Sequence, residues 1–172
     1  ILLLFLILLC KVQFAQDNID GTANNQDPVK IQRIESTVIL DGLSNEAAWE
    51  DIEAFPLTMH KPVYGNKPTE KSRVLVGYTD NYLYAAARFY DDDSHKIQSP
   101  YRKRDQQGLA CNWFWLGLDT FNDNENALLF FTSPSGHRLD VAISNDAVGS
   151  SCWDSNWNTF WGVETKVNDK GW

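Results

Sequence analysis

The sequence predicts an all-β protein, a sandwich or barrel of short antiparallel strands, and three observations lead to this fold class. Short runs rich in aromatic and β-branched residues recur along the chain, and clusters of Asn, Asp, Ser, Pro and Gly separate them. No segment with the 3.6-residue period of a helix extends beyond about two turns. At 172 residues the chain has the length of one domain, and it contains no internal repeat.

The clearest strands are consecutive and lie at residues 113–119, 127–132 and 137–143. The third run alternates, so that one face carries His137, Leu139, Val141 and Ile143 and the other carries Arg138, Asp140 and Ala142. The first run does not alternate, because Trp113 and Trp115 make its second face apolar as well. A strand that is apolar on both faces is either covered on both or keeps one face for a ligand.

A hairpin is expected earlier in the chain. Residues 72–79 and 82–90 read as strands, and Asp80-Asn81 between them is typical of a two-residue hairpin turn. In the second of these strands the alternation predicts one face formed by Leu83, Ala85, Ala87 and Phe89.

The remaining elements are shorter. Residues 31–40 are rich in branched side chains and predict a first strand, and residues 54–60 fit an edge strand. Residues 44–51 predict one short helix, which Ser44 can cap and Trp49 is expected to pack onto the body. A last alternating run covers residues 159–167.

The two ends of the chain suggest a piece of an exported protein. The first nine residues, ILLLFLILL, are too short for a membrane-spanning helix but suit the core of a secretory signal. Residues 1–16 are therefore expected to be the remnant of a signal peptide, and residues 17–32 a flexible polar leader. The domain is expected at residues 33–172 and to be truncated at its C-terminus, because a turn followed by the single Trp172 is an unusual ending.

The cysteines leave two readings open. Cys10 would be removed with the signal peptide, and Leu9 is bulkier than the small residue that usually precedes an acylated cysteine. Cys111 and Cys152 would then form either a disulfide or two separate buried thiols. The disulfide would close a loop of about forty residues and contribute roughly 3–4 kcal/mol in the chain-entropy model. The spacing of the cysteines and of the three histidines does not suggest a zinc site.

Charge and composition narrow the class of partner. The formal net charge is −8, and the only basic cluster, Arg102-Lys103-Arg104, is followed at once by Asp105. Nucleic acid is therefore not expected as a partner, because phosphates need a basic surface. Seven Trp, six Tyr and nine Phe make the chain rich in aromatic side chains, and most of the Trp follow residue 112.

Several of these pieces together resemble the family 9 carbohydrate-binding modules. The resemblance covers about residues 33–172 and depends on the order and spacing of its motifs rather than on any single one. The motifs are Ile39-Leu40-Asp41-Gly42-Leu43 with Glu46 and Trp49, Tyr82-Leu83-Tyr84, Tyr90-Asp91-Asp92, Arg104-Asp105, Leu118-Asp119-Thr120-Phe121-Asn122-Asp123, Ser135-Gly136 with Asp140, and Trp153-Asp154 with Trp157.

The resemblance implies a sandwich of two antiparallel sheets, export, and carbohydrate recognition. The chain looks most like the amino-terminal domain of large exported bacterial proteins whose remaining part is expected to form an outer-membrane barrel. The implied partners are an oligo- or polysaccharide and this downstream barrel, and the implied location is the periplasm or the cell surface. Some members hold structural calcium, which is the only cofactor implied.

This chain departs from the family at two points. Sugar-binding members clamp the sugar between two Trp side chains, but residues 101–110 contain no Trp at the position of the first, and the second lies beyond Trp172. Where the family often has an acidic residue before the central strand, this chain has Cys111-Asn112.

Sugar binding requires flat apolar faces for the C–H side of a pyranose and polar groups for its hydroxyls. The candidate faces are Trp113, Trp115, Trp153 and Trp157, and the candidate polar partners are Arg88, Arg104, Asp105 and Asp140. Trp153 and Trp157 are favoured because they lie in a loop beside a charged residue. In the alternative interpretation these indoles close the ends of the sandwich or contact a downstream part of the protein.

Neither a metal site nor a catalytic site is assigned. The acidic stretches at 91–93 and 119–125 are rich in oxygen ligands, but they lack the spacing of a calcium loop and read as solvated turns. No pair of carboxylates is singled out as acid and nucleophile for glycoside hydrolysis. Ser133, Ser135 and His137 lie close in sequence without the strand-to-helix setting of a nucleophile elbow.

The leading hypothesis is therefore a secreted, non-catalytic carbohydrate-binding module of a larger envelope protein. The parent protein would serve glycan degradation, the hydrolysis of O-glycosyl compounds, with this domain as its targeting arm. The alternative hypothesis is a structural domain that docks against an outer-membrane barrel and binds no sugar.

Overall fold

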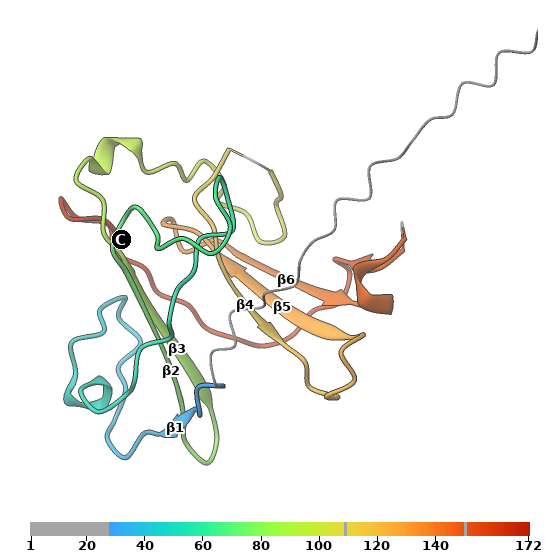
Figure 1. Ribbon diagram of the computed structural model, residues 1–172, viewed down its shortest axis with the longest axis horizontal. Helices are drawn as coiled ribbons and strands as arrows, with labels where there is room; N and C mark the ends of the chain where they lie inside the picture. Colours follow the sequence, from blue (N-terminus) through green and yellow to red (C-terminus); the bar gives the residue numbers. More distant parts are fainter. Residues whose placement is uncertain (1–27, 109, 150) are drawn as a thin grey trace, which may run out of the picture.

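The structure is a computed structural model, and it describes residues 28–172 except 109 and 150. The described chain forms two sheets with only short 3₁₀ turns between strands, which confirms the all-β fold class (Figure 1). The first sheet has the order β1-β2-β3, formed by Gln32–Arg33, Ser72–Tyr78 and Leu83–Phe89. The second has the order β4-β5-β6-β7, formed by Phe114–Leu118, Ala127–Thr132, Arg138–Ile143 and Trp153–Asp154.

The hairpin of β2 and β3 forms as the sequence predicts. The two strands pair antiparallel from Ser72 opposite Phe89 to Tyr78 opposite Leu83. The N–H of Thr79 donates to the carbonyl oxygen of Tyr82 over 2.9 Å and closes the turn, with Asp80 and Asn81 at its centre.

The second sheet contains the three predicted central strands, which match the expected ranges to within a residue at each end. Its register places Trp115 opposite Phe131, and Phe131 opposite Leu139. Residues directly opposite each other point to the same face of a sheet, so these three side chains share one face. Leu116, Phe130 and Asp140 occupy the other face in the same way.

The two expected strands at 31–40 and 54–60 are largely wrong, and the last alternating run forms no strand. Of residues 31–40 only Gln32–Arg33 form a strand, which pairs in parallel with Gly77 and Tyr78 of β2. Of residues 54–60 only Ala54 makes a single bridge, to Leu75. Residues 159–167, called the crossing segment below, alternate between exposed and half-buried side chains as an extended chain does, but no strand forms there.

The expected short helix is present as one 3₁₀ turn, η1 (Ala47–Trp49). Ser44 does not cap it: its hydroxyl accepts a hydrogen bond from Arg88 instead. Trp49 is buried against the first sheet, as expected, in a cluster with Ile34, Ala48, Ile52 and Leu75. Two further 3₁₀ turns, η2 (Ser94–Lys96) and η3 (Asn145–Ala147), lie in loops.

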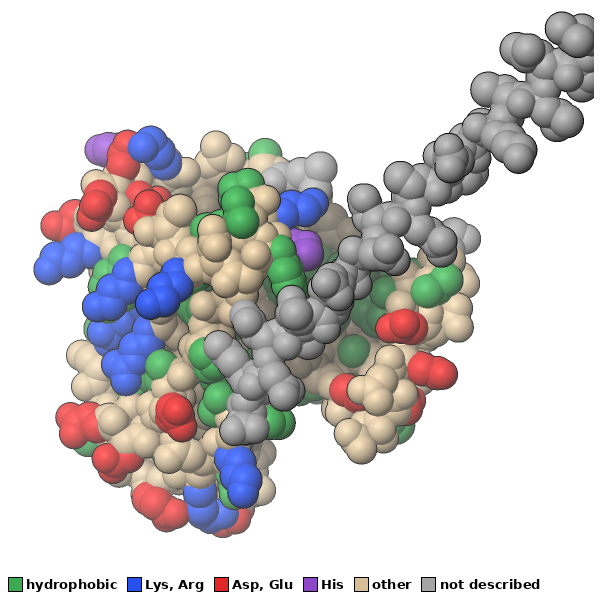
Figure 2. Space-filling model, in the orientation of Figure 1, with side chains coloured by type: hydrophobic (Ala, Val, Ile, Leu, Met, Phe, Trp, Pro, Cys, Tyr) green, Lys and Arg blue, Asp and Glu red, His purple; other side chains and the backbone are tan. Residues whose placement is uncertain are grey.

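The two sheets lie side by side and touch through aromatic rings. The rings of Phe89 at the end of β3 and Phe114 at the start of β4 have their centroids 5.5 Å apart. Figure 1 shows the crossing segment, in orange-red, running from the second sheet to the first, with the C-terminus beside β3. Figure 2 shows the two halves with a notch between them at the lower edge of the view.

The expected signal peptide at residues 1–16 and most of the expected leader at 17–32 lie outside the described residues. In the part that is described, none of the helices has the length and hydropathy of a transmembrane span.

Candidate functional site

Three aromatic side chains form a continuous surface on one face of the second sheet. Trp115 of β4 stacks on Phe131 of β5, with ring centroids 5.8 Å apart and planes at 28°. Phe131 in turn contacts Trp153 of β7, at 5.7 Å and 51°. We call Trp115, Phe131 and Trp153 the aromatic platform.

The platform is open to solvent at both ends. Trp115 is 55% exposed and Trp153 is 42% exposed, whereas large apolar side chains on a sheet are usually covered. The Trp115 indole lies beside Gly117: a Cβ atom at this glycine would stand 3.4 Å from Cζ3 of the indole, an ordinary contact, and 3.1 Å from Cδ2 of Leu129, a tight one. A side chain larger than a methyl group at this position would therefore meet the indole.

Trp113 supports the platform but does not extend its open surface. Its indole stacks on Tyr101, at 6.1 Å and 15°, and meets the Phe131 ring edge-on, at 6.2 Å and 86°. Its Nε1 donates a hydrogen bond to the carbonyl oxygen of Gly108 over 3.0 Å. Trp113 is half-buried in this setting, so its faces are used for packing.

A buried histidine lies beside this support. His137 is 2% exposed, and its ring centroid is 5.3 Å from that of Trp113 and 6.3 Å from that of Tyr101. Burial lowers the pKa of His137, although the negative charge of Asp105 acts in the opposite direction. The imidazole is therefore neutral at physiological pH, and it packs as an aromatic ring.

Trp157 lies on the opposite face of the second sheet, away from Trp153. Its ring meets Phe130 edge-on, at 6.0 Å and 76°, and Trp161 meets the same ring at 5.5 Å and 79°. The two favoured candidates, Trp153 and Trp157, therefore do not lie together on one face of the sheet. The structure separates them because β7 ends at Asp154 and the chain turns to the other face.

Arg104 and Asp140 form a buried ion pair rather than a sugar-binding pair. Nη2 of Arg104 lies 2.5 Å from Oδ1 of the fully buried Asp140, and Oδ2 accepts from the N–H of Thr159 over 2.7 Å. Arg104 also donates to Asn158 and to the carbonyl oxygen of Thr159. Asp105 lies 3.7 Å from Nε of Arg104 and its N–H donates to the carbonyl oxygen of Arg138.

Arg88 belongs to the first sheet and does not reach the platform. Its Nε donates to Oγ of Ser44 over 2.9 Å and its Nη2 to the carbonyl oxygen of Ser44 over 2.6 Å. Of the eight side chains predicted to bind sugar, only Trp115 and Trp153 thus form an open surface together, with Trp113 at its side.

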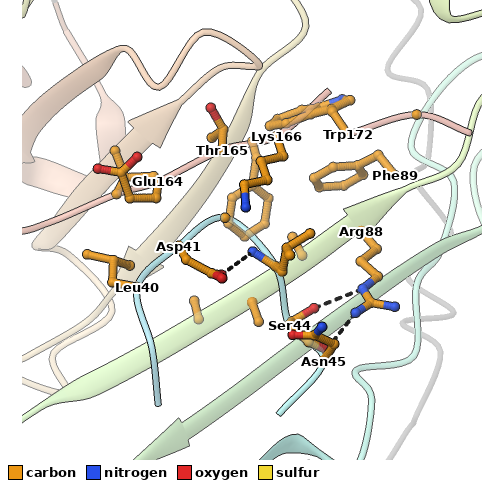
Figure 3. A pocket seen from close by; sticks show the side chains of 18 of the residues that line it. Leu40, Asp41, Ser44, Asn45, Arg88, Phe89, Glu164, Thr165, Lys166 and Trp172 are labelled. Atoms are coloured by element: carbon orange, nitrogen blue, oxygen red, sulfur yellow. Dashed lines mark hydrogen bonds between the residues drawn. The ribbon is translucent and has the colours of Figure 1, made fainter. Parts of the chain in front are cut away.

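A second feature, which sequence reasoning missed, is a cavity of about 570 Å³ between β3 and the last ten residues. Figure 3 shows β3 with Arg88 and Phe89 on one side, Glu164 to Lys166 of the crossing segment on the other, and Leu40 to Asn45 beside them. Trp172 closes one end against Phe89, with ring centroids 4.7 Å apart. The sequence feature that bears on this cavity is the alternating run at 159–167, which indicates an extended segment and forms one of its walls.

The carboxylates of the acidic stretch at 119–125 accept hydrogen bonds from backbone N–H groups of the same loop. Asp119 accepts from the N–H groups of Asp123 and Asn124, and Asp123 accepts from those of Glu125 and Asn126. Within the described residues, no three His, Cys, Asp or Glu side chains are grouped so that they could hold a metal ion.

Cys111 and Cys152 are separate thiols in the structure. Cys111 donates weakly to the carbonyl oxygen of Asn112, and Cys152 to that of Gly149 over 3.0 Å. Burial raises the pKa of Cys111, so at neutral pH the reactive thiolate form is rarer than in a free cysteine.

No family model matches this chain, and neither a curated protein nor a solved structure matches it. The resemblance to the family 9 carbohydrate-binding modules therefore remains an expectation from the sequence motifs.

Proposed function

We propose that this chain is a non-catalytic carbohydrate-binding domain and that a glycan stacks on the aromatic platform. The observation that carries the proposal is the position of Trp115, which lies against Gly117, stacks on Phe131 and is more than half exposed. The C–H face of a pyranose is flat and apolar, and an open indole held in a fixed orientation is its usual partner in a protein site.

The platform offers a surface for more than one sugar ring. Trp115 and Trp153 both contact Phe131, so their two exposed indoles lie on either side of it on one face of the sheet, which runs from β4 over β5 and β6 to β7. A chain of at least two sugar units would contact both indoles, while a single sugar would use only one. We therefore propose an oligo- or polysaccharide as the ligand.

A binding role without catalysis fits the setting of Asp140, which was a candidate polar partner for a sugar. Both oxygens of Asp140 accept hydrogen bonds and its side chain is fully buried, so it is not available as an acid or a base. Export, a place in the cell envelope and service to a glycan-degrading parent protein belong to the same proposal.

Calorimetry with short oligosaccharides of glucose, xylose, mannose and N-acetylglucosamine tests the proposal. We expect at least one series to bind, and Trp115→Ala and Trp153→Ala each to weaken its affinity by about tenfold or more, which corresponds to about 1.4 kcal/mol. Trp157→Ala is the matched control, because it removes an indole from the opposite face, and its affinity should stay unchanged. Binding that survives both platform substitutions would contradict the proposal.

A further inference from the structure

One edge of the first sheet is unpaired beside the cavity. β3 is the last strand of its sheet, and Phe89 at its end exchanges two hydrogen bonds with Trp172, over 2.7 and 3.0 Å. Every second residue of an antiparallel strand points its N–H and C=O to the same side. Leu83, Ala85 and Ala87 therefore point away from β2 as Phe89 does, and within the described chain they have no backbone partner on that side.

The crossing segment is unpaired as well. None of the N–H groups of residues 160–167 donates to a backbone carbonyl of the described residues, although the chain there is extended. Val163 to Lys166 line the same cavity as β3. Extended backbone with unpaired N–H and C=O groups is a template for a further strand.

The turn at the end of the chain directs the backbone between these two edges. Asn168 and Gly171 exchange two hydrogen bonds, over 2.9 and 3.3 Å, around the central residues Asp169 and Lys170. Gly171 also forms an antiparallel bridge with Tyr90. A backbone continued from Trp172 in this direction would run antiparallel to β3 and antiparallel to the crossing segment, into the cavity.

We propose that the cavity takes a β-strand joined to the carboxyl side of Trp172, which pairs with β3 on one edge and with the crossing segment on the other. The existing pairs fix its register. The first residue of the strand lies opposite Arg88 and Lys166, and the second lies opposite Ala87 and Thr165. The cavity follows β3 from Tyr84 to Tyr90, a length that suits about five residues.

The register also predicts the composition of this strand. Its second and fourth side chains share the face of Ala87, Ala85 and Val163, which is the side where Phe89 meets Phe114, and they are expected to be apolar. Its first side chain lies between Arg88 and Lys166, where a polar or acidic residue fits the two cations. Its third side chain lies between Ala86 and Glu164, where a neutral residue fits better than an acidic one.

Gly171 is essential to this arrangement. It has φ +123°, and a Cβ atom at this position would stand 1.9 Å from the carbonyl oxygen of Phe89. Any other residue would push the turn away from β3. Gly65 offers a matched control, because it also has a positive φ, +85°, but has open space around it.

Amide hydrogen exchange tests the proposal. The chain ending at Trp172 is compared with the same chain extended by Thr-Val-Thr-Val-Thr. In the extended chain we expect exchange to slow by about tenfold or more at the amides that the register pairs. These are the amides of Ala85 and Ala87 in β3 and of Glu164 and Lys166 in the crossing segment. The amides of Val163 and Thr165 point away from the added strand, so their exchange rates should stay unchanged.

Gly171→Ala should abolish this protection in the extended chain, and Gly65→Ala should not. A second control leaves residues 1–172 unaltered and places Pro at the second and fourth positions of the extension. Proline has no N–H to donate to β3, so this extension should not protect the four amides. Unchanged exchange at the four amides would overturn the proposal. If the free pentapeptide at the same concentration protected these amides equally, the strand would not need to be joined to Trp172, and that part of the proposal would be wrong.

Discussion

The guanidinium group of Arg104 and the carboxylate of Asp140 lie 2.5 Å apart, with Asp140 fully buried in β6. This pair also binds Thr159. Asp140 accepts a hydrogen bond from the N–H of Thr159, and Arg104 donates one to the carbonyl oxygen of Thr159. The pair therefore holds the start of the crossing segment against the second sheet.

Asp140→Ala should lower the free energy of unfolding by about 1–3 kcal/mol, because Arg104 loses its buried partner while its side chain, 31% exposed, keeps contact with water. Asp105→Ala should cost at most about 1 kcal/mol, since that carboxylate is 3.7 Å from Nε and partly exposed. Urea denaturation of the two variants checks this. Equal losses of stability in the two variants would show that Arg104 gains no more from Asp140 than from Asp105.

Gly117→Val should weaken glycan binding as much as Trp115→Ala does, although residue 117 itself would not contact the sugar. The added methyl groups would occupy the space of the Trp115 indole and tilt it off the strand. Calorimetry measures the affinity, and thermal unfolding verifies that the variant is folded. A folded variant with the affinity of the original chain would contradict the role given to Gly117.

The stability of the fold should fall as pH drops below about 6.5, because burial lowers the pKa of His137 from that ordinary value. The unfolded chain then binds a proton that the folded chain resists, so the stability present above pH 6.5 is lost toward the lowered pKa. The measurement is the difference in melting temperature between about pH 7.5 and about pH 5.

His137→Phe should reduce this difference, since it keeps a buried ring and removes the titrating group. His95→Phe is the matched control at an exposed histidine and should keep the original pH dependence. The same dependence in all three proteins would mean that other groups cause it.

Cys111 should react slowly with iodoacetamide in the native protein at neutral pH, because burial raises its pKa and the thiolate is the reactive form. After unfolding without reductant, Cys111 and Cys152 should both be alkylated, since the structure has them as free thiols. Mass spectrometry of the peptides checks both statements. A chain that is alkylated only after reduction would instead contain the disulfide.

The sequence was sufficient for elements whose partners are close along the chain. The β2–β3 hairpin and the strands β4, β5 and β6 follow from alternation and from turn residues such as Asp80 and Asn81, because each strand pairs with its neighbour. The crossing segment has the same alternation, but alternation reports only an extended chain with two different faces. Whether a strand forms depends on a partner, and the described chain offers it none.

The candidate site could be predicted only in part for a similar reason. Trp115 and Trp153 were singled out by residue type, but Phe131 joins the site through cross-strand register, which the sequence does not state. Gly117 lies beside Trp115 because it is two residues further along the same strand. Trp157 was favoured together with Trp153 because both lie in a loop beside a charged residue, yet the chain turns between them and Trp157 packs on Phe130. Arg104 and Asp140 have the chemistry of sugar-binding residues, and burial directs them to each other instead.

The most direct measurement for the proposed function is a titration of the ¹⁵N-labelled chain with an oligosaccharide, followed by NMR through the indole N–H signals of its seven Trp. The account predicts that the signals of Trp115 and Trp153 shift with a common affinity, while those of Trp49, Trp157 and Trp161 stay in place. If no glycan moves the two platform signals, or if a glycan moves only the indoles on the opposite face, the platform is not a carbohydrate site.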